Sequence, residues 1–115
     1  MIVYGIKNCD TMKKAFTWLD NHKVEYTFHD YRKPGLTEAD IENFLKLTDL
    51  ESFVNKRSTS WRALSDEEKL AVMDPKTAGP ILIAHPTLIK RPFIVDGDRV
   101  MIGFSEASFT EAFTK

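Results

Sequence analysis

The N-terminal part of the chain changes its hydrophobic period twice. Residues 2–4 are a short β-branched and aromatic run closed by Gly5, a pattern typical of a buried strand. The apolar residues then recur at helical spacing, at Met12, Ala15, Phe16 and Leu19. This spacing predicts an amphipathic helix that starts near Cys9 and stops around residues 21–22. Residues 24–31 alternate as a second strand, so a βαβ unit with parallel strands is expected.

The middle of the chain has helical signals separated by breaks. The tripeptide Lys33-Pro34-Gly35 interrupts the strand pattern, and residues 37–40 resemble a capping box that opens a helix. A second capping box follows at residues 65–68. Further short helices are expected at residues 50–54, 67–73 and 77–85. We therefore expect a helical insertion over about residues 36–85.

The C-terminal part returns to strand patterns. Apolar runs of strand type occur at residues 88–89, 93–95 and 100–102, and two antiparallel strands are expected to end the sheet. The last two are joined by a hairpin turn at residues 96–98, and Ser105 is placed to cap a final helix with Phe109 on its inner face. The order βαβ, helical insertion, ββα predicts the α/β (α+β) class. We expect a thioredoxin-like mixed sheet of four strands flanked by helices.

The composition and charge fit one folded domain spanning residues 1–115. Apolar residues make up 43% and charged residues 29% of the chain, and the net charge of −1 argues against nucleic acid or an anionic membrane as partner. We find no signal peptide and no apolar run of the roughly 20 residues that a membrane helix needs. The single cysteine excludes an internal disulfide and favours a cytoplasmic location. His22, His29 and His85 lack metal-ligand spacing, so no metal is expected.

Cys9 is the main candidate for chemistry. It falls where the first strand has ended and the first helix begins, among amide groups that have no partner within the helix. These amides and the helix dipole favour an anion, so a thiolate at this position is expected to be stabilised and nucleophilic. The alternative is that Cys9 is only a small buried apolar residue, which is common for a free cysteine.

The residues after Cys9 define what kind of redox chemistry is open to it. The run Cys9-Asp10-Thr11-Met12 has the spacing of a dithiol motif, but methionine stands where the second thiol would be. The chain therefore needs an outside thiol to complete a redox cycle through a mixed disulfide, and glutathione is the abundant cytosolic candidate. The Thr11 hydroxyl is a candidate hydrogen-bond donor to the sulfur, or an ordinary first-turn threonine.

A second constellation precedes one of the C-terminal strands. Pro92 stands directly before that strand, a position in which a cis peptide bond is often found. Arg91 beside it is a candidate for contacting an anion held at Cys9, or is an ordinary surface arginine. For Trp61 and Arg62 two interpretations also remain. Trp61 either packs within the insertion and Arg62 is a solvated charge, or both act near a cleft.

Five short motifs occur in order along nearly the whole chain. They are residues 4–11 (YGIKNCDT), 29–32 (HDYR), 55–62 (NKRSTSWR), 89–92 (IKRP) and 103–105 (GFS). With these motifs the sequence resembles the arsenate reductase (ArsC) family, which includes Spx-type regulators, and most closely its YffB-like members. The resemblance implies a thioredoxin-like fold with a helical insertion, Cys9 as the nucleophile, and Arg91 before a cis Pro92 facing it. It also implies glutathione binding, for which we name Asn8, Thr11, Arg57 and Pro92.

The resemblance also separates three functions. Arsenate reductases of this family use three arginines around the oxyanion, and only Arg91 is matched here; the other two positions fall on Asn55 and Gly103. We therefore expect a glutathione-dependent thiol or disulfide reductase, with arsenate reduction disfavoured. The alternative is an Spx-like regulator that binds RNA polymerase, although such regulators usually carry a Cys-x-x-Cys pair and this chain has Met12.

Overall fold

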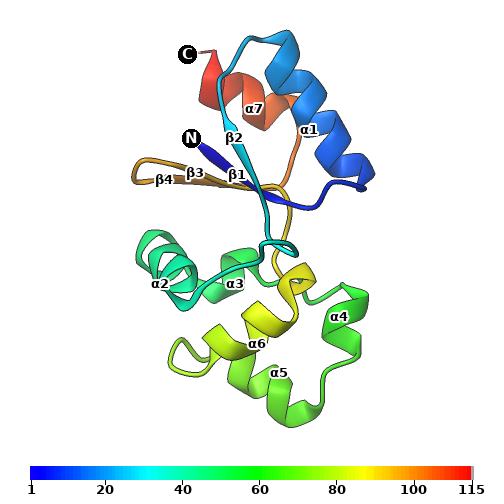
Figure 1. Ribbon diagram of the computed structural model, residues 1–115, viewed down its shortest axis with the longest axis vertical. Coiled ribbons are helices and arrows are strands. Elements are labelled where there is room, and N and C mark those ends of the chain that lie inside the picture. Colours follow the sequence, from blue (N-terminus) through cyan, green and yellow to red (C-terminus); the bar gives the residue numbers. More distant parts are fainter. Residues whose placement is uncertain (115) are drawn as a thin grey trace. The chain divides into compact units, whose positions relative to one another are not determined.

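The computed structural model describes residues 1–114, and the chain divides into two compact units. The sheet unit is formed by Met1–Asp30 together with the chain from Arg91 onward, and the helical unit is Tyr31–Lys90 (Figure 1). The sheet unit contains β1 (Ile2–Gly5), α1 (Asp10–Asn21), β2 (Thr27–Asp30), β3 (Phe93–Asp96), β4 (Arg99–Ile102) and α7 (Glu106–Phe113). That the whole chain acts as one domain stays a prediction.

The four strands form one mixed sheet in the order β2-β1-β3-β4. β1 pairs in parallel with β2, as the βαβ pattern predicted, and Val3 lies opposite Phe28 in that ladder. β3 pairs antiparallel with both β1 and β4. The hairpin between β3 and β4 has Gly97 at φ 65°, a conformation that glycine adopts without steric cost. The predicted thioredoxin-like fold class is confirmed.

Helices α1 and α7 cover one face of this sheet (Figure 1). The core beneath them is built from side chains that are at most 1% exposed, among them Val3, Leu19, Ile94 and Phe109. Trp18 of α1 meets Phe109 of α7 edge to face, with ring centroids 5.4 Å apart. Each large apolar side chain buried in this core contributes about 1.5–3 kcal/mol. This packing holds α1 against the sheet.

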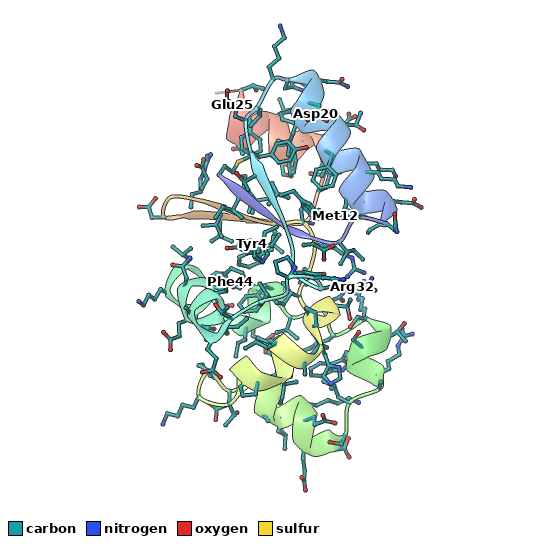
Figure 2. The ribbon with its side chains drawn as sticks, in the orientation of Figure 1. Tyr4, Met12, Asp20, Glu25, Arg32 and Phe44 are labelled. Atoms are coloured by element: carbon teal, nitrogen blue, oxygen red, sulfur yellow. The ribbon has the colours of Figure 1, made fainter. Side chains whose placement is uncertain are left out.

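Met12 anchors the start of α1 to the sheet. Its side chain is fully buried and points from α1 toward the strands, whereas Tyr4 points to the opposite face (Figure 2). Gly5, at the end of β1, gives it room: a Cβ built on Gly5 would lie 2.4 Å from Met12 Cε and 2.5 Å from Sδ. The absence of a side chain at Gly5 therefore lets the methionine pack against the backbone.

The second strand is shorter than predicted because the end of α1 occupies its first residues. Lys23 has φ 55°, the left-handed conformation that closes many helices. The Lys23 N–H donates to the Asp20 carbonyl and the Val24 N–H to the Leu19 carbonyl, which together form a Schellman motif. Regular pairing starts only at Thr27.

The helical unit contains α2 (Glu38–Leu47), α3 (Leu50–Phe53), α4 (Thr59–Arg62), α5 (Asp66–Val72), α6 (Ala78–Ala84) and the 3-10 turn η1 (Pro86–Leu88). Both predicted capping boxes are present. The hydroxyls of Thr37 and Ser65 each accept the backbone N–H of the residue three positions later, and the carboxylate of that residue accepts the backbone N–H of the capping residue. The apolar run at residues 88–89 forms no strand of the sheet. Leu88 ends η1, and Ile89 forms only an isolated bridge with Val54.

The two ends of the helical unit are joined to each other. The Tyr31 hydroxyl donates to the Ile89 carbonyl at 3.0 Å, and the Tyr31 side chain is fully buried. Beside it, the Lys90 N–H donates to the Phe53 carbonyl at 2.8 Å. The insertion is therefore a closed loop of chain. Among residues 1–114, no helix combines the length and the apolar character that a membrane span requires.

Candidate active site around Cys9

Cys9 is the N-cap residue of α1. Its backbone is extended, with φ −141° and ψ 129°, and its carbonyl accepts the first intrahelical bond from the Lys13 N–H at 2.9 Å. The residue is partly buried and its thiol is free. Strand β1 ends four residues earlier, so the sulfur lies at the strand-to-helix junction that the sequence pattern predicted.

The surroundings of the Cys9 sulfur lower the pKa of the thiol. Partial burial is the largest single influence and raises the pKa. It is outweighed by the backbone N–H of Met12, a hydrogen bond from the Arg91 side chain, the backbone N–H of Thr11 and the positive charge of Arg91. The Cys9 side chain makes no cap hydrogen bond, and the two amides favour the charged form of the thiol through their dipoles. The net result is a stabilised thiolate.

Arg91 and Cys9 come together although they lie near opposite ends of the chain. The Arg91–Pro92 peptide bond is cis, as predicted, and Pro92 is buried directly before β3. The Pro92 carbonyl accepts the Gly103 N–H at 2.9 Å, which ties this segment to the residue after β4. The guanidinium of Arg91 therefore reaches the sulfur from a strand start that is fixed on both sides.

Thr11 acts differently from the hydroxyl donor considered in the sequence. Its contribution at Cys9 comes from its backbone N–H, and its side chain is exposed. Asn8 is also exposed, directly before Cys9. That Asn8, Thr11 and Pro92 bind glutathione stays a prediction; all three belong to the sheet unit, as Cys9 does.

Arg57 lies in the helical unit, in the turn before α4. Its side chain is exposed, and its backbone N–H donates to Asn55 Oδ1 at 3.0 Å. Its role in glutathione binding stays a prediction. Trp61 packs within this unit: the ammonium groups of Lys56 and Lys69 lie 5.9 Å and 5.8 Å from its ring centroid. This cation–π arrangement supports the packing interpretation of Trp61.

One feature of the site was not named from the sequence. It is the backbone N–H of Met12, which contributes to the thiolate although the Met12 side chain belongs to the core. Within the part of the chain that the structure describes, no cluster of potential metal ligands is present.

The chain is similar to known proteins over nearly its whole length. The ArsC family matches residues 4–112. An uncharacterised protein of Haemophilus influenzae is 47% identical over 115 residues, covering 96% of each chain. The global transcriptional regulator Spx of Streptococcus pneumoniae is 30% identical over 102 residues, 86% of this chain and 74% of the relative. The solved structure of the YffB protein superimposes with a TM-score of 0.86 at 39% identity over 96% of each chain.

Proposed function

The chain belongs to the ArsC family, and on that premise we propose that it is a glutathione-dependent thiol–disulfide reductase that works through Cys9. The observation that carries the proposal is the environment of the Cys9 sulfur, which holds two backbone amides and the Arg91 guanidinium. These groups favour the thiolate, which is the nucleophile in thiol–disulfide exchange.

The proposed cycle uses one thiol of the protein. The Cys9 thiolate attacks the glutathione sulfur of a substrate RS–SG, the S–S bond breaks, and RS⁻ leaves and takes up a proton. The new bond is a Cys9–SG mixed disulfide. A glutathione thiolate then attacks the glutathione sulfur of this adduct, which releases oxidised glutathione and restores the Cys9 thiolate. The sum is RS–SG plus glutathione giving RSH plus oxidised glutathione.

Arg91 has two tasks in this cycle. In the free protein its charge and hydrogen bond favour the thiolate. When Cys9 leaves the mixed disulfide in the second step, negative charge returns to the same sulfur, and the guanidinium is already in place to stabilise it. The Met12 side chain is fully buried, so the side chain at the position of the second thiol in a dithiol motif packs in the core and carries no redox chemistry. The cycle therefore depends on glutathione from solution.

The experiment is turnover of a glutathionylated peptide with reduced glutathione, measured by the oxidised glutathione that forms. We expect wild type to turn over and Cys9→Ser to be inactive while keeping its far-UV circular dichroism. Intact mass after incubation with oxidised glutathione should show one added glutathionyl group on wild type and none on the variant. Turnover by folded Cys9→Ser, or no adduct on wild type, would contradict the proposal.

A second function is favoured by one specific observation, the similarity to a protein named as the global transcriptional regulator Spx. An Spx-like role would make RNA polymerase the partner of this chain. Met12 argues against redox sensing by a thiol pair at this site, because Cys9 has no second cysteine to pair with. Retention of RNA polymerase on immobilised protein, with Cys9→Ser behaving like wild type, would favour the regulator over the reductase.

A further inference from the structure

A groove of the sheet unit lies between α1 and the start of α7. It has a volume of about 820 Å³. The residues important here are Lys13, Lys14, Thr17 and Trp18 from α1, with Phe104 and Glu106 from the start of α7. Its size is that of a small-molecule site. Cys9 and Phe104 both pack against the hydrophobic core of this unit, so the groove and the thiol share one supporting layer.

The groove begins one helical turn from the thiol. Cys9 caps α1 and its carbonyl accepts the Lys13 N–H at 2.9 Å, so Lys13 lies one helical turn further along the helix from Cys9. Thr17 follows Lys13 and donates its hydroxyl to the Lys13 carbonyl at 2.8 Å. A molecule attached to the Cys9 sulfur can therefore lie along α1 and enter the groove.

The charges of the groove match one chemical class of ligand. Its α1 wall carries the ammonium groups of Lys13 and Lys14, and the start of α7 contributes the Glu106 carboxylate. Within residues 1–114, none of these three is in an ion pair. Glutathione carries two carboxylates and one ammonium group. Its charges are therefore opposite in sign to the two ammonium groups and the one carboxylate of the groove. Phe104 and Trp18 supply apolar walls between the charges.

We infer that the groove between α1 and α7 binds the glutathionyl group attached to Cys9, with Lys13 and Lys14 facing its carboxylates and Glu106 facing its ammonium group. This inference rests on the proposed function and names a binding site for its co-substrate. Three extended residues span about 10 Å, whereas Lys13 is about 6 Å along the helix axis from Cys9. The ligand therefore occupies only the half of the groove nearest the thiol.

The test compares two disulfides on the same thiol. Second-order rate constants for modification of Cys9 are measured with oxidised glutathione and with the uncharged hydroxyethyl disulfide, at one pH and ionic strength. The ratio of the two constants removes any change in the thiolate fraction. The variants are Lys13→Gln, Lys14→Gln and Glu106→Gln. Lys23→Gln is the matched control, because it removes the same charge just after α1 and outside the groove.

We expect the ratio to fall about two- to fivefold in Lys13→Gln and in Lys14→Gln, the range of one exposed ion pair, and to stay unchanged in Lys23→Gln. Glu106→Gln separates specific binding from a general field. If only the overall charge of the groove matters, removal of the Glu106 carboxylate makes the groove more positive and raises the ratio. If Glu106 is the partner of the glutathione ammonium group, its removal lowers the ratio.

The two proposals fail in different ways. If Cys9 forms the glutathione adduct but the ratio is unchanged in both lysine variants, or rises in Glu106→Gln, the groove does not bind the ligand and the reductase proposal stands. If wild-type Cys9 reacts with hydroxyethyl disulfide but forms no adduct with oxidised glutathione, the reductase proposal itself fails. A fall in the ratio in all three variants supports the groove.

Discussion

Replacing Gly5 by alanine tests the packing that holds the start of α1. The new methyl carbon would lie 2.4 Å from Met12 Cε and 2.5 Å from Met12 Sδ, well inside van der Waals contact. A flexible side-chain end can usually move away from such an overlap. Met12, however, is fully buried, and its neighbours in the core include Val3 and Leu19 at 0% exposure. The displaced methionine therefore has to compress a layer that is already close-packed.

The expected cost of Gly5→Ala is about 1–3 kcal/mol, the usual range for one extra methyl group in a packed core. Shortening the partner should remove the conflict. Met12→Ala alone is expected to cost about 2–5 kcal/mol because it leaves a cavity. In the Met12→Ala background the Gly5→Ala methyl group enters the space that the methionine has left. The double variant should therefore lose at least about 1 kcal/mol less unfolding free energy than the sum of the losses in the two single variants.

The assay is urea unfolding of the four proteins of this cycle, followed by tryptophan fluorescence and by far-UV circular dichroism. Coincident transitions and equal m-values license the comparison of unfolding free energies. Gly97→Ala is a control of another kind, because its cost should come from φ 65° with no atom within 4 Å of the new Cβ, and it should be additive with Met12→Ala. Additivity of Gly5→Ala and Met12→Ala would refute the packing argument.

Three further predictions concern the thiol, the oxyanion chemistry and the helical unit. In wild type, the rate of Cys9 alkylation against pH should titrate below the free-thiol pKa of about 8.5, and Arg91→Ala should move the midpoint up because the thiolate loses its guanidinium; equal midpoints would assign the lowered pKa to the backbone amides alone. Arsenate turnover with glutathione and glutaredoxin should be negligible, because Asn55 and Gly103 stand at two of the three arginine positions; robust turnover would show that another cation substitutes. Ser65→Ala should lower the unfolding free energy by about 1 kcal/mol through loss of the N-cap of α5, measured by urea unfolding, and an unchanged midpoint would mean that the cap contributes nothing.

Elements with local signals were predictable from the sequence. The capping boxes at Thr37 and Ser65 and the N-cap at Ser105 mark helix starts by side-chain chemistry that acts within one turn. Helix α4 was missed because it is only four residues long and is set by the Ser58 cap. The sequence pattern at Ile89 is compatible with a strand or an isolated bridge, because β-branched residues favour both, and only the tertiary partner, Val54, separates the two.

The candidate site was predictable in its residue types and less so in its contacts. The strand-to-helix junction identified Cys9 because the pattern changes period there. No local rule brings Arg91 to Cys9. That contact requires β3 to pair antiparallel with β1, which is a property of the whole sheet. The sequence leaves open whether the Thr11 hydroxyl is a donor, whereas the contribution of Thr11 at Cys9 comes from its backbone N–H, as it does for anions at helix starts generally.

The hydrogen bond between Tyr31 and Ile89 has a consequence for how this chain tolerates change. It closes a loop of 58 residues, and closing a loop of that length costs on the order of 3–4 kcal/mol of chain entropy, a cost that grows only slowly with length. Once this hydrogen bond has closed the loop, an added or deleted residue between α2 and α6 changes this cost by only about 0.01–0.02 kcal/mol. Natural insertions and deletions are therefore expected within the loop that the Tyr31–Ile89 hydrogen bond closes. The few residues from Ile89 to Pro92 are expected to keep a constant length.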